Sequence, residues 1–138
     1  MAILPVTVST ATSLKRNVHA NGVLILLDST TGRTLTLPAS TGKGDTYEVY
    51  LPTTVSSGSH VVAALTTDII QGSVAIATDI AGVTCPTTAT TDKITLSGST
   101  TGGLLGSYLK LVDAKSGQWM VSGTLVSSGA EATPFSET

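Results

Sequence analysis

The chain has 138 residues, of which only 12% are charged and 4% aromatic, and its formal net charge is -2. The seven basic residues are scattered, so the chain lacks the basic surface that nucleic-acid binding requires, and its single cysteine excludes an intrachain disulfide bond. No apolar run approaches the roughly 20 residues of a membrane helix, so we expect a protein without a membrane segment.

The composition favours β-strands over helices. Serine and threonine together make up about three residues in ten, well above their share of an average chain. Threonine, like valine and isoleucine, branches at Cβ and suits a pleated strand better than a helix. The strong helix formers Glu, Lys, Gln and Arg are scarce. We therefore expect an all-β protein with a core of small aliphatic side chains, to which contacts with partners add stability.

Residues 1–20 show no helical period and are predicted to form an extended N-terminal arm. The apolar residues of this segment are Ile3, Leu4, Val6 and Val8. Pro5 restricts the segment to an edge strand or to no strand at all. We predict that the four apolar residues and the adjacent cations Lys15 and Arg16 bind a partner, because exposed apolar segments of this kind mark interaction sites.

Residues 21–128 are predicted to form one β domain. Short alternating runs are separated by turns of Gly, Pro, Asp and Ser, a pattern typical of a small antiparallel β-sandwich or barrel. The expected strands are 23–27, 33–37, 46–51, 60–65, 93–96, 108–112 and 118–126. Pro38 and Pro52 each end one of them. At least seven strands, antiparallel pairing throughout and helix in fewer than about a tenth of the residues are expected.

Three segments fit the strand pattern less well. Residues 65–81 leave room for a helical turn at 66–70. Residues 84–91 are predicted to form a threonine-rich loop around Cys85, and residues 129–138 are predicted to form a polar C-terminal tail.

Two parts of the chain are similar to each other. The run 31–37, followed by Thr41-Gly42, resembles the run 91–96, followed by Thr101-Gly102, and a tyrosine-containing strand follows each run. Either both runs use the same hairpin chemistry independently, or a duplicated hairpin forms two related halves of the domain.

The chain offers few residues for catalysis or metal binding. His19 and His60 are not spaced as a zinc-binding pair, and His60 is expected to lie partly exposed at the start of a strand. Cys85 has no apparent activating neighbour, and no nucleophile or phosphate-binding motif is present. We predict no enzymatic activity, no metal and no cofactor. Trp119 is either packed in the core or an anchor at an interface.

Four stretches of the sequence follow one pattern, that of short strands with Thr/Gly-rich turns. They are 33–42 with Gly44 and Tyr47, His60-Val61-Val62, 94–103, and 108–119 closing on 129–136. Together they extend over residues 20–136 and resemble small virion structural proteins of tailed phages, of the capsid decoration (cement) type.

The resemblance implies a protein that is made in the host cytoplasm, binds the major capsid protein on the outer capsid surface of the virion, and stabilises the shell. It implies no catalytic or cofactor residue. Many weak repeated contacts suffice for such a role. A homo-oligomer, a trimer rather than a dimer, is expected, because a chain poor in aromatic residues should cover its apolar arm against a partner. Lys15 and Arg16 are then expected to pair with carboxylates of the capsid protein. The alternative is a tail, baseplate or fibre module that binds a host surface glycan or protein.

Overall fold

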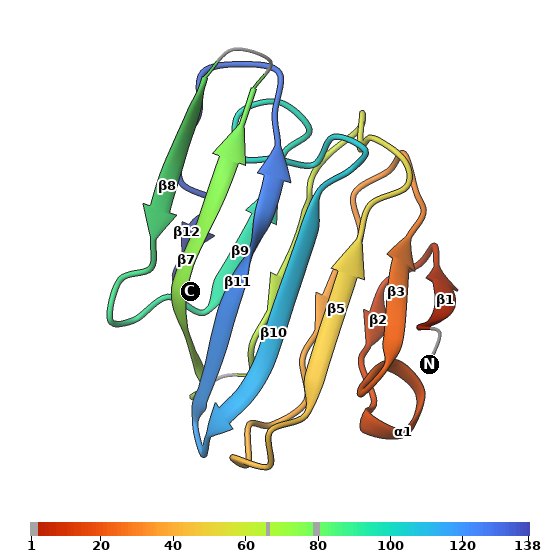
Figure 1. Ribbon diagram of the computed structural model, residues 1–138, viewed down its shortest axis with the longest axis vertical. Helices are drawn as coiled ribbons and strands as arrows, with labels where there is room; N and C mark the ends of the chain where they lie inside the picture. Colours follow the sequence, from red (N-terminus) through yellow and green to blue (C-terminus); the bar gives the residue numbers. More distant parts are fainter. Residues whose placement is uncertain (1–2, 66, 79–80) are drawn as a thin grey trace.

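The computed structural model describes residues 3–65, 67–78 and 81–138, and it consists of two β-sheets that face each other (Figure 1). The larger sheet has seven strands, in the spatial order β1 (Leu4–Val8), β3 (Val23–Leu27), β5 (Thr46–Tyr50), β10 (Tyr108–Lys115), β11 (Gln118–Val126), β7 (Ile69–Ala77) and β8 (Gly82–Pro86). The smaller sheet has five strands, in the order β12 (Phe135–Ser136), β9 (Lys93–Leu96), β6 (His60–Ala63), β4 (Thr34–Thr36) and β2 (Thr12–Ser13). Within the described ranges helix is limited to α1 (Arg16–His19), which confirms the prediction of an all-β chain with little helix.

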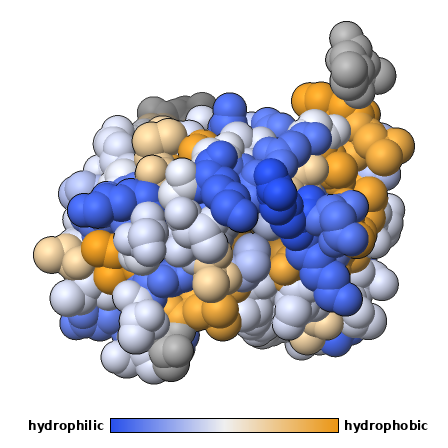
Figure 2. All heavy atoms as spheres, turned by 90° about the horizontal axis from the view of Figure 1, so that it is seen from below, coloured by the Kyte–Doolittle hydropathy of each residue, from blue (hydrophilic) through white to orange (hydrophobic). Residues whose placement is uncertain are grey.

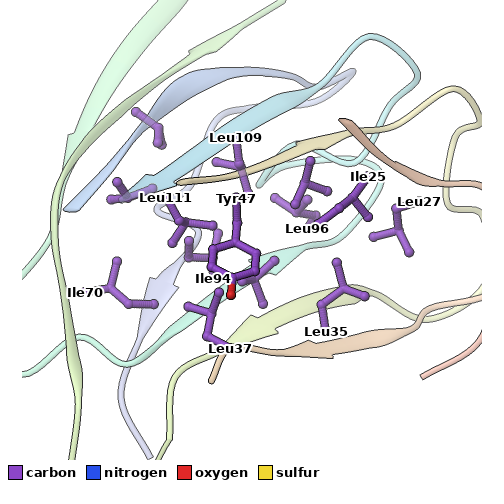
Figure 3. Packing of buried hydrophobic residues seen from close by; sticks show 14 of the residues in the cluster. Ile25, Leu27, Leu35, Leu37, Tyr47, Ile70, Ile94, Leu96, Leu109 and Leu111 are labelled. Atoms are coloured by element: carbon purple, nitrogen blue, oxygen red, sulfur yellow. The ribbon is translucent and has the colours of Figure 1, made fainter. Parts of the chain in front are cut away.

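The core lies between the two sheets, where side chains from both layers meet (Figure 3). Buried and partly exposed residues alternate on the central strands, because successive side chains of a strand point to opposite faces. Val49 on β5 and Leu109 on β10 point inward and are at most 1% exposed, and Leu35 and Ile94 of the smaller sheet are fully buried. Trp119, which is 1% exposed, also belongs to this core, which confirms the first of its two predicted placements.

The expectation of antiparallel pairing throughout is wrong, because both sheets are mixed. β3 pairs in parallel with β5, β4 with β6, and β7 with β11. From β3 to β7 the chain alternates between the two sheets, so strands that are neighbours in sequence lie in opposite layers instead of forming hairpins. Two strands of one sheet are then joined by a crossover through the other sheet, which permits parallel pairing. The alternating pattern has a period of two in either arrangement, so it does not report strand direction.

The expected extended arm of residues 1–20 is not confirmed. β1 pairs with β3 at the edge of the larger sheet, and β2 pairs with β4 at the edge of the smaller one. Val8 and Leu14 lie in the core and are 6% and 3% exposed. The alternating side chains of β1 continue the inner face of β3, so the segment is stabilised by its own chain. Pro5 does lie on an edge strand, as expected.

Two further segments that were expected to be irregular contain strands. The expected loop at 84–91 begins instead with residues of β8, and Cys85 on this strand is buried. The expected C-terminal tail contains β12, which pairs with β9 and buries Phe135. Pairing with a neighbouring strand decides these conformations more than local sequence does. Where a helical turn was considered at 66–70, β7 begins at Ile69, and residue 66 lies outside the described residues.

The two similar runs of the sequence occupy related places. β4 and β9 flank β6 in the smaller sheet, and the strands that follow them, β5 and β10, are neighbours in the larger sheet. β4 runs parallel to β6 and β9 runs antiparallel to it, so the two copies point in opposite directions. The next neighbours differ: β3 is parallel to β5, whereas β11 is antiparallel to β10. The correspondence is therefore confined to one pair of strands in each half.

Gly123 lies where β11 passes close to β10. Its φ is +150°, and a Cβ atom at this position would lie 2.2 Å from the carbonyl oxygen of Tyr108. Gly123→Ala must therefore push two paired strands apart, and we expect it to lower the free energy of unfolding by about 3 kcal/mol. Gly117→Ala is the control, because its Cβ would meet no atom within 4 Å and only the left-handed backbone, φ +82°, should cost about 1 kcal/mol. Urea unfolding followed by circular dichroism measures both, and equal losses would contradict the steric explanation.

Candidate functional site

The structure separates the apolar residues that were predicted to bind a partner. Val8 is buried in the core of its own chain, which corrects its assignment to a partner surface. Leu4 and Ile3 are 62% and 51% exposed, and Val6 is intermediate. Leu4, Val6 and Val8 share one face of β1, and their burial increases toward the core. Of the four apolar residues, Ile3 and Leu4 at the start of β1 therefore form the exposed apolar surface.

Lys15 and Arg16 are adjacent in sequence but differ in environment. The Arg16 Nε atom donates to Asp45 Oδ2 at 2.7 Å, and Asn21 Nδ2 donates to Asp45 Oδ1 at 2.9 Å. The hydrogen bond from Asn21 and the one from Arg16 hold the pKa of Asp45 below its ordinary value. Arg16 is thus engaged within its own chain. Lys15 is exposed and has no carboxylate within ion-pair distance in the described part of the chain.

The larger sheet extends beyond the smaller one at both edges (Figure 1). The inner face there is covered only in part: Val8 and Cys85 are buried, but Leu4 on β1 is 62% exposed and Val83 on β8 is 43% exposed. At the first edge, Val18 of α1 is 44% exposed, and α1 packs against β3. Figure 2 shows apolar surface gathered on the right, the side of the molecule that carries β1.

We call Ile3, Leu4, Lys15 and Val18 the β1 edge, and Val83, Cys85 and Glu131 the β8 edge.

The outer face of the larger sheet carries the two aromatic side chains that the core does not take up. Tyr50 of β5 lies opposite Tyr108 of β10, and Glu48 lies opposite Lys110 in the same pair of strands. All four are partly exposed and alternate with buried residues. The Tyr108 hydroxyl donates to Glu48 Oε1, and burial together with this contact raises the pKa of Tyr108 to about 12. Apolar side chains extend this outer face on both sides: Leu24, Leu26, Val112 and Met120.

Both histidines are buried, and His60 is not partly exposed as predicted. His60 Nδ1 accepts a hydrogen bond from the Arg33 N–H at 3.0 Å, and burial lowers its pKa. His19 Nδ1 accepts from the Lys15 N–H at 2.9 Å, and burial lowers its pKa as well. The prediction for His60 failed because Val61 and Val62 are both apolar, so the pattern did not show that residues 60 and 62 share the inner face. Among the described residues, no three His, Cys, Asp or Glu side chains form a group that could hold a metal ion.

One buried carboxylate, which the sequence pattern did not single out, fastens a loop to the larger sheet. Asp113, near the end of β10, is 2% exposed. Its Oδ1 atom accepts hydrogen bonds from Ser40 Oγ at 2.7 Å and from the Gly42 N–H at 2.8 Å, and its Oδ2 atom accepts from Thr41 Oγ1 at 3.0 Å. The Thr41 N–H also donates to Oδ1, at 3.0 Å. These donors lie about seventy positions away in the sequence, so only the fold brings them to the carboxylate.

Comparison with protein-family models, with curated proteins and with solved structures found no match for this chain. No helix in the described ranges is long and apolar enough to cross a membrane. The chain itself offers three surfaces that could contact a partner: the outer face, the β1 edge and the β8 edge.

Proposed function

We propose that this chain is a phage capsid decoration protein, a β-sandwich that binds the outside of the shell as a homo-oligomer, a trimer in preference to a dimer, and stabilises the shell without catalysis. The observation that carries the proposal is the outer face of the larger sheet. Its centre is aromatic and apolar, with Tyr50, Tyr108 and Met120 around a single pair of opposite charges, Glu48 and Lys110.

This surface has the properties of a protein-binding face. Tyrosine and methionine are enriched at the centre of protein interfaces, whereas charged residues are depleted there. The side chains stand on hydrogen-bonded strands in the middle of a seven-stranded sheet, so little conformational entropy is lost when a partner binds. Repetition over many copies on a shell then converts modest individual contacts into firm attachment.

Addition of the protein to undecorated capsids tests this proposal. Combined Tyr50→Ala and Met120→Ala substitutions should lower the number of bound copies at least about tenfold, because interface energy is concentrated in a few such residues. Tyr108 is left intact because its hydroxyl donates to Glu48. Thr34→Ala, an exposed position on β4 of the opposite sheet, is the matched control and should bind as the unchanged protein does. Unchanged occupancy of the double variant at equal stability would exclude the outer face as the capsid contact.

A second function is favoured by one specific feature, the side-by-side placement of Tyr50 and Tyr108. Two neighbouring aromatic rings on a sheet offer apolar faces with polar ends, which suits a sugar as well as a protein. A tail, baseplate or fibre module that binds a host glycan is therefore the alternative. Labelled antibody on intact particles separates the two: label over the head supports the decoration role, and label confined to the tail supports the alternative.

A further inference from the structure

The two edges of the larger sheet both expose apolar side chains, and they carry charges of opposite sign. At the β1 edge, Ile3 and Leu4 are 51% and 62% exposed, and Lys15 is an exposed cation without an ion-pair partner among the described residues. Ile3 and Leu4 at the start of β1 and Lys15 directly before α1 are thus all exposed, and in Figure 1 α1 lies on the same side of the molecule as β1.

The β8 edge presents an apolar patch beside an unpaired anion. Val83 shares the inner face of β8 with Cys85, since their partners on β7, Ile76 and Val74, are both buried. Glu131 lies close enough to Cys85 that, after burial, its charge contributes to raising the pKa of the thiol. The Glu131 Oε1 atom is buried and has no hydrogen-bond partner in the described part of the chain. The Glu131 side chain as a whole is partly exposed, and a cation supplied from outside the chain would offset its charge.

The backbone of both edges limits pairing by strand addition. In β1, Leu4 N–H donates to Gly22 and the Val8 carbonyl accepts from Asp28, so the alternate residues, Pro5 included, turn their backbone outward. In β8, the Thr87 N–H donates to the Gly72 carbonyl, and by the same alternation Pro86 faces outward. Proline has no N–H to offer, so each edge lacks a donor that an added strand would need. Backbone pairing with an added strand is thus interrupted at either edge, which favours contacts through side chains.

From these observations we propose that copies of this chain associate head to tail, with the β1 edge of one copy on the β8 edge of the next. Ile3 and Leu4 of one copy cover Val83 of its neighbour, and the Lys15 ammonium pairs with the Glu131 carboxylate across the contact. The two surfaces lie at opposite edges of one sheet, so each copy uses both. A repeated head-to-tail contact closes a ring when its rotation divides a full turn, and otherwise gives an open filament. Three copies per ring correspond to the trimer proposed above. This contact leaves the outer face free, so it is independent of how the ring meets a shell.

Light scattering after size exclusion, without capsids, tests the proposal. The unchanged chain should have about three times the 13.9 kDa mass of one copy. Leu4→Asp and Val83→Asp should each give monomers, because each places a charge in one half of the contact. The control Thr34→Asp, on the outer side of the smaller sheet, should remain trimeric.

Mixing the two monomeric variants gives the decisive measurement. Leu4→Asp keeps an intact β8 edge and Val83→Asp keeps an intact β1 edge, so an equimolar mixture should form a heterodimer, although neither variant associates alone. A two-fold contact between identical edges, or variants that merely misfold, would yield no such complex and would overturn the proposal. In the same assay Lys15→Glu should weaken association, and adding Glu131→Lys to it should restore association. A monomeric unchanged chain at micromolar concentration would also overturn the proposal.

Discussion

Replacing Asp113 with alanine is expected to lower the free energy of unfolding by about 3–5 kcal/mol, because it leaves several buried donors without an acceptor. The Asp113 carboxylate is the shared acceptor for Ser40 Oγ, Thr41 Oγ1 and the backbone N–H groups of Thr41 and Gly42. Without it, the loop that contains Ser40 loses its attachment to the end of β10. Asp28→Asn, an exposed carboxylate that accepts a hydrogen bond from Thr53, is the control and should cost less than about 1 kcal/mol.

The same carboxylate should make stability depend on pH in the acid range. Burial acts to raise the pKa of Asp113, but the hydrogen bonds from Gly42, Ser40 and Thr41 outweigh it, so the pKa in the folded state lies below the ordinary value. Above about pH 5 the group is ionised in both states and its stabilisation is complete. As the pH falls below that value, the unfolded chain takes up the proton first, and the stabilisation is lost until the folded-state pKa is passed.

Urea unfolding at several pH values between 7 and 2.5 measures this dependence. Asp113→Asn should flatten the acid decline relative to the unchanged protein, although part of the decline should remain because the pKa of Asp45 is also held low. A decline of the same slope in Asp113→Asn would show that other groups govern acid unfolding. A loss below about 1 kcal/mol for Asp113→Ala at pH 7 would contradict the role given to the carboxylate.

Trp119→Ala is the second substitution with a large expected effect, a loss of about 3–5 kcal/mol. The Trp119 side chain is 1% exposed and meets the Tyr47 ring edge to face, with centroids 5.6 Å apart and an interplanar angle of 74°. The surrounding core is closely packed and mostly aliphatic, so it can relax only partly into the cavity that the missing ring leaves. Denaturant unfolding followed by far-ultraviolet circular dichroism measures the loss without relying on the indole.

Tyr47→Phe is the informative comparison for that variant. The Tyr47 hydroxyl is buried and has no hydrogen-bond partner in the described residues, so removing it should leave stability within about 1 kcal/mol of the unchanged protein or raise it. A large loss in Tyr47→Phe would mean that the hydroxyl is bonded in solution. A loss below about 2 kcal/mol in Trp119→Ala would mean that the core collapses around the missing ring.

Several elements could be read from local pattern alone. The strands at Val23–Leu27, Lys93–Leu96 and Gln118–Val126 have the predicted bounds, because a period of two between Gly, Pro and Asp turns is a local property. The outward placement of Glu48 and Tyr50, opposite Tyr47 and Val49, follows from the same alternation. For the β1 edge the sequence indicated an apolar surface with adjacent cations, although it did not separate Val8 from Leu4.

The β8 edge could not be predicted from the sequence, because Val83, Cys85 and Glu131 come together only when the chain segment before β12 folds beside β8. Asp113 was missed for the same reason, since its donors lie across the fold.

By itself, the sequence of this protein determined the β class, the places of the predicted strands, with exact bounds for three of them, and the face on which most of their side chains lie. These properties follow from Cβ branching and from alternation between neighbouring residues. Only the tertiary structure decided which strands pair, in which direction, and which termini are held in place. Pairing depends on contacts between residues distant in sequence, and a parallel and an antiparallel neighbour bury the same alternating face. For that reason residues 4–8, read locally as an arm, became the edge strand of the larger sheet, and the surfaces exposed at its two edges became visible only in the folded molecule.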